Sequence, residues 1–314
     1  MKVLFIDQVH PILQKQLIEA GYSIEEDYRC SYEDLANKIS LYHGLVIRSR
    51  LKIDNNILSQ ANGLRFIARS GAGLENIDLS AANEQNIEVF NSPEGNRTAV
   101  GEHALGMLLM LLNNLHSSNR DIRSGLWERE KNRGKELSSM TVGIIGVGNM
   151  GRSFVEKLKG FNCKVLAFDK YNPIKAEGNM TPASLDQIQF EADVVSFHTP
   201  HTTETHHYFN EDFLNSMENP FYLINTARGT AVETSALVKG LKQGKVLGAA
   251  LDVLEYEPSS FEQLDLSSLP QSFKELLAFE NVVLSPHVAG WTHESLIKLA
   301  EVLGNKIIGT FGTI

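Results

Sequence analysis

Short apolar runs rich in β-branched residues alternate with helix-patterned stretches along almost the whole chain. This order is typical of parallel βαβ units, in which each crossover helix covers one face of a sheet. It therefore predicts an α/β fold built on parallel sheets. The expected strands, in chain order, are 3–6, 45–47, 66–68, 87–90, 142–145, 165–168, 194–197, 222–224, 249–253 and 282–284.

These strands form two groups, which are separated by a long apolar helical pattern at 98–115 and a polar stretch at 117–139. The six later strands, with helices between them, predict a doubly wound sheet of Rossmann type. The four earlier strands predict a smaller sheet of flavodoxin-like kind. The chain is therefore expected to form two α/β domains.

Helical periodicity at 293–308 predicts a last helix that returns to the first domain. We therefore expect a discontinuous smaller domain of 1–95 and 291–314, and a Rossmann-type domain of 96–290. A cleft is expected between the two. The least regular segment, 257–280, is expected to be an expanded loop with one short helix.

The charge balance and the cysteine content exclude several classes of protein. A net charge of -9 and a pI near 5.6 argue against a nucleic-acid binder, which would carry a basic face. The apolar run at 104–112 is far shorter than the ~20 residues that span a bilayer. Cys30 and Cys163 are too few for a disulfide framework and favour a reducing cytoplasm. We expect a cytoplasmic protein with neither nucleic-acid nor membrane partners.

A glycine motif, GVGNMG at 146–151, follows an expected strand and opens a helical pattern. In this context Gly146 permits a tight turn, Gly148 lets the backbone approach a pyrophosphate, and Gly151 allows close helix–strand packing. The N-terminus of the helix, at Asn149 and Met150, would then face the phosphates with its partial positive charge. The motif predicts a dinucleotide site.

Asp169 ends the next expected strand, where a carboxylate can bind both ribose hydroxyls. Its charge would repel the extra phosphate of NADP, so NAD is the predicted cofactor. Lys170 beside it argues in the other direction. The alternative reading is a cluster of turn glycines with a surface aspartate.

Most other chemically capable side chains directly follow an expected strand. Ligands of open parallel sheets bind at the carboxyl ends of the strands, so these residues predict two rims of one site. Besides the glycine motif and Asp169, the rim of the larger sheet comprises His198, Thr199, Pro200, Thr226, Arg228, Asp252 and His287. The rim of the smaller sheet comprises Arg48, Ser49, Arg50, Ser70, Gly71, Ala72 and Gly73. Each residue also has a structural alternative. Arg228 would be a surface cation, Asp252 would cap a turn, and His287 would be a buried histidine of the core. The histidine spacing predicts no metal site.

The chain resembles the D-2-hydroxyacid dehydrogenase family over about residues 44–300. The motifs that carry the likeness are NTARG at 225–229, the Leu-Asp-Val…Glu-Pro stretch at 251–258, SPH at 285–287 and GVGNMG. The resemblance implies that the larger domain binds NAD and that the smaller domain binds the substrate. It also implies a homodimer, whose expected contacts are the apolar face of 98–115 and Trp127. The alternative is that both lie in the core of one domain.

The resemblance also implies roles for single residues. Arg228 would bind the substrate carboxylate and polarise its ketone, His287 would be the acid/base, and Glu257 would pair with His287. Asp252 is expected near the nicotinamide carboxamide, and the backbone amides of 69–73 at the substrate carboxylate. A carboxylate partner stabilises the imidazolium and should raise the pKa of His287, so ketone reduction should weaken as the pH rises.

IRSR at 47–50 resembles the segment of D-3-phosphoglycerate dehydrogenases that meets the substrate phosphate. Arg48 and Arg50 would bind phosphate through paired hydrogen bonds, or would be ordinary surface cations. Only 27 residues follow His287, so a short form without the regulatory domain is expected. Trp291 departs from the family pattern at a position that affects the substrate.

The sequence thus favours an NAD-dependent dehydrogenase of 3-phosphoglycerate, an enzyme of serine biosynthesis. Two alternatives stay open. Within the family, the protein would be a glyoxylate or hydroxypyruvate reductase. Outside catalysis, it would be an NAD-sensing binding protein similar to the family's corepressors, which can keep the catalytic residues.

Overall fold

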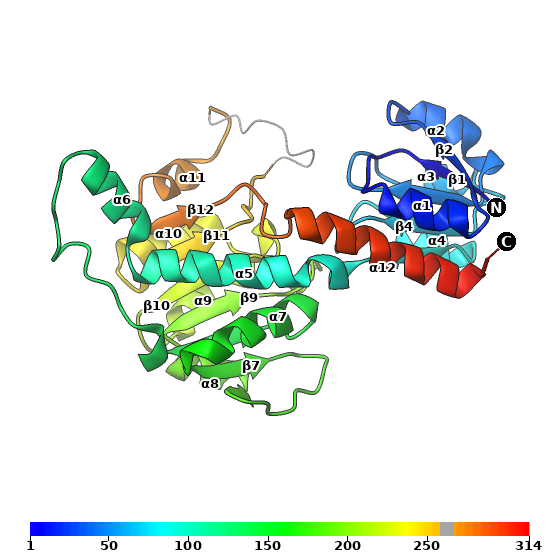
Figure 1. Ribbon diagram of the computed structural model, residues 1–314. Helices are drawn as coiled ribbons and strands as arrows, with labels where there is room; N and C mark the ends of the chain where they lie inside the picture. The colour runs from blue at the N-terminus through cyan, green and yellow to red at the C-terminus, as the bar shows by residue number, and fades with distance from the viewer. Residues whose placement is uncertain (258–266, 314) are drawn as a thin grey trace. The chain divides into compact units, whose positions relative to one another are not determined.

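The computed structural model describes residues 1–257 and 267–313, and the chain divides into two compact units (Figure 1). Unit 1 comprises Met1–Arg97 and Trp291–Ile314, and unit 2 comprises Thr98–Gly290. The first boundary lies two residues later than the expected one, inside helix α5 (Pro93–Leu112), which continues from one unit into the other. The loop expected at 257–280 falls partly on 258–266, outside the described residues.

Unit 1 contains a five-stranded parallel sheet in the order β2-β1-β3-β4-β5. This is the flavodoxin-like order, as predicted. The edge strand β2 was not predicted, because its sequence SIEE has no apolar run and it is only partly buried. The strands are β1 (Lys2–Phe5), β2 (Ser23–Glu26), β3 (Gly44–Ile47), β4 (Phe66–Arg69) and β5 (Glu88–Asn91).

Helices cover both faces of this sheet. On one face α1 and the C-terminal helix α12 lie side by side (Figure 1), and Leu303 and Ile307 of α12 share a core with Val3 and Phe5 of β1. The other face is covered by the three remaining helices. The helices are α1 (Ile12–Glu19), α2 (Tyr32–Lys38), α3 (Asn55–Leu58), α4 (Leu79–Glu84) and α12 (His293–Phe311), with a 3-10 turn at Ile39–Leu41.

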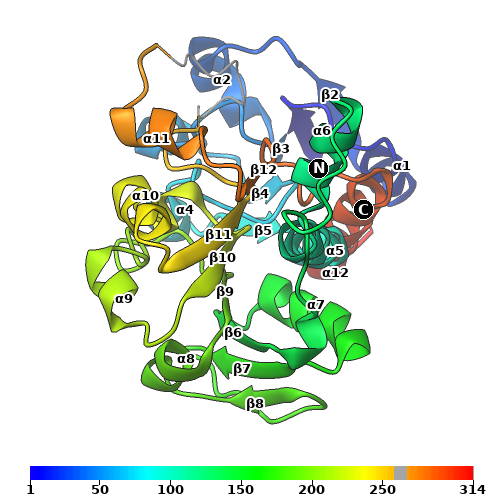
Figure 2. The same cartoon turned by 90° about the vertical axis from the view of Figure 1, so that its left-hand side faces the viewer.

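Unit 2 contains a seven-stranded parallel sheet in the order β12-β11-β10-β9-β6-β7-β8 (Figure 2). From β8 to β11 this is the Rossmann order, in which the strand that carries the glycine motif, β6, lies between β7 and β9. The short edge strand β8 was not predicted, because only Met180 of its three residues is buried. The strands are β6 (Thr141–Ile145), β7 (Lys164–Phe168), β8 (Met180–Pro182), β9 (Val194–Phe197), β10 (Phe221–Asn225), β11 (Val246–Leu251) and β12 (Val282–Leu284).

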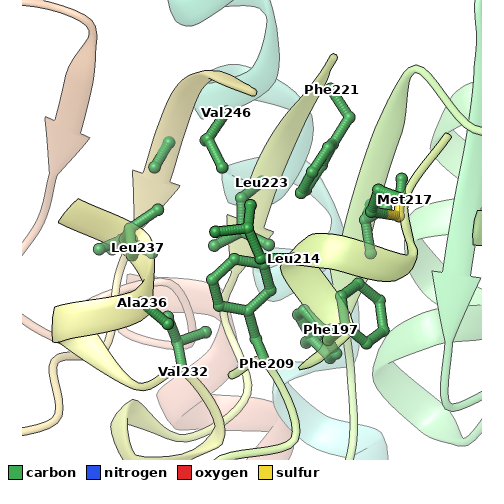
Figure 3. Close-up of a cluster of buried hydrophobic side chains, with 14 of the residues drawn as sticks. Phe197, Phe209, Leu214, Met217, Phe221, Leu223, Val232, Ala236, Leu237 and Val246 are labelled. Carbon is green, nitrogen blue, oxygen red and sulfur yellow. The ribbon is translucent and has the colours of Figure 1, made fainter. Parts of the chain in front are cut away.

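Two apolar cores, one on each face, hold this sheet. Figure 3 shows one of them, in which Phe197 and Leu223 of the sheet meet Leu214 of α9 and Leu237 of α10. On the other face α5 and α7 pack through Leu108, Leu111 and Phe154. The helices are α6 (Leu115–Arg123), α7 (Asn149–Leu158), α8 (Leu185–Glu191), α9 (Glu211–Ser216), α10 (Thr234–Lys242) and α11 (Gln271–Leu276), with 3-10 turns at Leu137–Ser139, Lys159–Phe161 and Gly229–Ala231.

The long helix expected at 98–115 is α5, which begins earlier, at Pro93, and ends at Leu112. Asn114 adopts a left-handed backbone conformation with φ 50°, so α5 ends before it and α6 begins after it. The helix α6 was not predicted, and it covers the first part of the polar stretch at 117–139. None of the helices in the described part of the chain is long and apolar enough to cross a bilayer.

Candidate active site

The glycine motif forms the turn between β6 and α7. Gly146 has φ 91°, and a Cβ added to it would lie 2.7 Å from the carbonyl oxygen of His198. A Cβ on Gly151 would lie 2.1 Å from the carbonyl oxygen of Gly146, so only glycine fits at both positions. A Cβ on Gly148 would meet no atom within 4 Å. Space is therefore open in front of the first turn of α7, at Asn149 and Met150, where a pyrophosphate is expected to bind.

The carboxylate of Asp169 closes this turn from the end of β7. One oxygen accepts from the amide of Val147 at 2.9 Å, and the other accepts from Tyr171 at 3.1 Å and Asn172 at 2.8 Å. Burial alone would raise the pKa of Asp169, but these amide donors outweigh it and hold the pKa below its usual value. Asp169 therefore keeps its negative charge where a ribose is expected.

Lys170 is paired with a carboxylate in this structure. Its ammonium forms an ion pair with Glu204 and lies 5.6 Å from the centre of the Tyr171 ring. Glu204 also accepts a hydrogen bond from the Tyr171 hydroxyl. Because Glu204 neutralises it, Lys170 offers less attraction to an additional phosphate than its place beside Asp169 suggested.

Three buried polar atoms at the ends of β9 and β10 have no hydrogen-bond partner among the described residues. They are Nδ1 of His198, Oγ1 of Thr199 and Oγ1 of Thr226. Burial lowers the pKa of His198 to about 4, so its ring is neutral, and Nε2 lies 2.8 Å from Ser196 Oγ. Unpartnered buried polar atoms are rare in native proteins, and a bound dinucleotide could supply their partners. Together with the space at Gly148, they fit the expected cofactor.

Arg228 follows β10 on a turn that Asn225 holds in place. Asn225 Oδ1 accepts from the amide of Ala227 at 3.0 Å, and its Nδ2 donates to the carbonyl of Arg228 at 2.8 Å. The guanidinium of Arg228 donates to the Ala227 carbonyl at 2.7 Å. A Cβ on Gly229 would lie 1.9 Å from the carbonyl oxygen of Leu254, so this turn packs against the segment that leads to Glu257.

The structure brings together His287 and Glu257. Nδ1 of His287 lies 3.1 Å from Oε1 of Glu257, and both side chains are partly exposed. His287 has φ 54°, an uncommon conformation for a residue other than glycine, and its amide donates to the Asp252 carbonyl at 2.7 Å. The conformation is thus held by the end of β11.

Asp252 anchors the segment that carries His287. Its buried carboxylate accepts from the Ser285 hydroxyl at 2.6 Å and from the amides of Val288 and Ala289 at 2.9 Å each. His103 of α5 completes the group, with Nε2 2.9 Å from Ser285 Oγ. This role of His103 and Ser285 was not predicted from the sequence. The only available signal was a histidine at the start of an apolar helical pattern. The role of Asp252 at the nicotinamide stays a prediction.

The two arginines after β3 differ in their contacts. Arg50 donates to Asp7 Oδ1 at 3.0 Å and to the carbonyls of Cys30 and Ile6 at 2.7 Å each, so its guanidinium is bound within unit 1. Arg48 has no ion pair with any described residue; its guanidinium carbon instead lies 4.3 Å from the centre of the Trp291 ring. The sequence does not distinguish the two arginines, and it does not indicate that Asp7 binds one of them.

The loop after β4 presents backbone donors. Gly71 has φ 148°, its carbonyl accepts from the amide of Ser92 at 2.9 Å, and the carbonyl of Ala72 accepts from Asn91 Nδ2 at 2.6 Å. Ser70 is buried and its amide donates to Ile47. The amides of Gly71, Ala72 and Gly73 have no acceptor within the part of the chain that the structure describes. These three amides fit an anionic group such as a carboxylate.

Residues 105–289 match the family model for the NAD-binding domain of D-isomer specific 2-hydroxyacid dehydrogenases. The chain belongs to this family. A D-3-phosphoglycerate dehydrogenase of Archaeoglobus fulgidus is 32% identical over 98% of this chain and 57% of its own length. A glyoxylate reductase of Thermofilum pendens is 35% identical over 90% of this chain and 82% of its own.

A solved structure of a D-lactate dehydrogenase from Aquifex aeolicus, complexed with NAD and lactic acid, has the same fold. It superposes with a TM-score of 0.82 at 28% identity and covers 99% of this chain and 95% of that one. The chain spans little more than half the length of the phosphoglycerate dehydrogenase that it matches. Family and NAD-binding domain are therefore settled, whereas the names of the relatives disagree about the substrate.

Proposed function

We propose that the protein interconverts a D-2-hydroxy acid and its 2-keto acid with NAD, and that the pair is 3-phosphoglycerate and 3-phosphohydroxypyruvate, a step of serine biosynthesis. The general reaction is supported by one observation above all, the His287–Glu257 pair within the NAD-binding unit that also carries Arg228. The choice of substrate is supported by Arg48, a half-buried arginine without an ion pair among the described residues.

Proton transfer falls to His287 in this mechanism. When bound, NAD supplies the redox chemistry at the carbonyl carbon. His287, paired through Nδ1 with Glu257, uses Nε2 to donate a proton to the oxygen of the keto acid, and takes it back in the opposite direction. The guanidinium of Arg228 stabilises the negative charge that develops on this oxygen. Asn225 holds Arg228 in place by binding its carbonyl.

The two anionic ends of the substrate would have separate sites. The amides of Gly71, Ala72 and Gly73, which have no acceptor among the described residues, would bind the carboxylate. Arg48 would bind the phosphate, because a guanidinium matches phosphate oxygens with two parallel N–H donors. Ser49 and Arg50 would shape this loop, since Arg50 is bound to Asp7.

NADH absorbance with a set of keto acids tests the proposal directly. Turnover of phosphohydroxypyruvate should exceed that of glyoxylate and hydroxypyruvate in kcat/KM. Arg48→Met should raise the KM for phosphohydroxypyruvate about tenfold or more, with a much smaller effect on glyoxylate. Arg65→Met is a matched control, because Arg65 precedes β4, at the amino end of a strand of the same sheet, and its guanidinium also lies over an aromatic ring, Phe311. Equal effects of Arg48→Met on all substrates would reject phosphate binding.

Glyoxylate reduction is the second candidate. The observation in its favour is that the Thermofilum relative matches over 82% of its own length, whereas the phosphoglycerate dehydrogenase matches over 57%. A preference for glyoxylate in the same assay would select this function. Binding of NAD without turnover of any keto acid would instead favour an NAD-sensing protein.

We also propose a homodimer. Most of the apolar face expected to form it, at 98–115, is buried in the core of unit 2, so the contacts would be α6 and the segment after it, which includes Trp127. Four large apolar side chains are exposed there: Leu115, Ile122, Leu126 and Trp127, the last with 78% of its surface accessible. Exposed apolar side chains gathered in one short stretch are typical of an interaction surface. Sedimentation should show a dimer for the wild type and a monomer for an Ile122→Glu, Trp127→Glu variant. A monomeric wild type would reject the dimer.

A further inference from the structure

Trp291 is half exposed, with 51% of its surface accessible. The guanidinium of Arg48 covers it, with the guanidinium carbon 4.3 Å from the ring centre. Trp is the ring that attracts cations most strongly, and about 6 Å is the limit of such contacts. Stacking occupies the flat face of the guanidinium and leaves the in-plane N–H donors available.

Two side chains, those of Asp7 and Asn76, bind the backbone of Arg48. Its amide donates to Asp7 Oδ2 at 2.6 Å, and its carbonyl accepts from Asn76 Nδ2 at 3.1 Å. Burial lowers the pKa of Arg48, and the attraction of Asp7 counters this lowering. A half-buried cation without an ion pair is unfavourable, and an anion bound at its free donors would compensate the lost hydration.

The backbone that follows Trp291 is anchored in unit 1. Trp291 directly precedes Thr292, the N-cap of α12, whose hydroxyl accepts from the amide of Ser295 at 3.0 Å. Farther along, α12 is anchored in the core of unit 1 by Ala300 and Leu303. Trp291 also follows His287 by only four residues, so the covalent chain limits the separation of their Cα atoms to about 14 Å.

We propose that Trp291 is a positioning residue that orients Arg48 as an anion receptor, so that the enzyme selects keto acids with a second anionic group. The inference rests on the proposed function and adds a residue to it. With Trp291 in place, the donors of Arg48 are fixed before the substrate arrives. A substrate without a distal anion gains nothing from this arrangement. The pair therefore affects one class of substrate and not the other.

Kinetics with two substrates tests the proposal. Trp291→Leu keeps an apolar side chain but removes the aromatic face, and Trp291→Phe keeps that face. We expect Trp291→Leu to raise the KM for phosphohydroxypyruvate about tenfold, with less than about a threefold change for glyoxylate, and Trp291→Phe to restore most of the loss. In an Arg48→Met background, Trp291→Leu should have little further effect. Equal effects on both substrates, or additive effects of the two changes, would overturn the proposal.

Fluorescence provides a second test that does not depend on turnover. Trp127 and Trp291 are the two tryptophans, so a Trp127→Phe variant reports on Trp291 alone. Titration with 3-phosphoglycerate should change its emission with saturation, titration with glycolate should not, and Arg48→Met should abolish the response. A response without turnover of phosphohydroxypyruvate would support this inference and reject the proposed substrate. Turnover of phosphohydroxypyruvate without a fluorescence response, together with an unchanged KM in Trp291→Leu, would support the proposed substrate and reject this inference.

Discussion

Nδ1 of His287 lies 3.1 Å from Oε1 of Glu257, within hydrogen-bond distance. Keto acid reduction draws a proton from His287, and the hydrogen-bonded carboxylate of Glu257 holds the ring that donates it. Glu257→Gln should therefore lower kcat for reduction about tenfold or more at neutral pH. His287→Gln should lower kcat about 100- to 10,000-fold while NAD binding persists.

Glu255→Gln is the matched control for this experiment. Glu255 lies two residues before Glu257 and pairs with His207 at 2.8 Å, so its removal takes the same charge from the same segment. It should leave kcat for reduction nearly unchanged. An equal loss of kcat in both variants would show that general electrostatics, and not the His287–Glu257 pair, sets the rate.

Asp252 should matter more for stability than an ordinary carboxylate. Asp252→Asn places an amide where three donors require acceptors, and the lost contacts should reduce the free energy of unfolding by about 2–4 kcal/mol. The exposed Asp212→Asn should change it by less than about 0.5 kcal/mol. Thermal unfolding of both variants measures the difference. Equal stabilities would contradict the anchoring role.

Asp169 should set the choice between NAD and NADP. Because its pKa lies below the usual value, it is charged throughout the neutral range. Asp169→Ser should lower the ratio of kcat/KM for NAD over NADP by about 10- to 100-fold, as expected for loss of a charge-assisted hydrogen bond. Lys170→Met should leave the ratio nearly unchanged, because Lys170 is paired with Glu204. A large change of this ratio in Lys170→Met would show that Lys170, and not Asp169 alone, sets the choice of cofactor.

His198 should make the free energy of unfolding depend on pH in the acid range. Its pKa is about 4 in the folded chain and 6.5 in the unfolded one, so between these values the unfolded chain binds the extra proton. Stability is therefore undiminished above pH 6.5 and falls as the pH drops toward 4, by up to roughly 3 kcal/mol. In His198→Gln this decline should be weaker. Parallel melting temperatures of wild type and variant from pH 7 to 4 would contradict the prediction.

The sequence alone predicted the class of fold and the strands with continuous apolar runs, because buried parallel strands must be apolar. It missed the edge strands β2 and β8, whose residues are half exposed and carry no such run. It also extended α5 to Leu115, since the break depends on one backbone conformation at Asn114. Local pattern does not encode exposure at a sheet edge.

The candidate site divides in the same way. The glycine motif, Asp169, Arg228 and His287 could be named from the sequence, because parallel strands bring their carboxyl ends to one edge and family motifs mark those ends. The sequence could not predict that Asp7 binds Arg50 or that Arg48 lies over Trp291, because the partners lie far apart in the chain. The same holds for His103 and Ser285 beneath Asp252. Periodicity specifies which elements form, and only packing in three dimensions decides which partner each charged side chain receives.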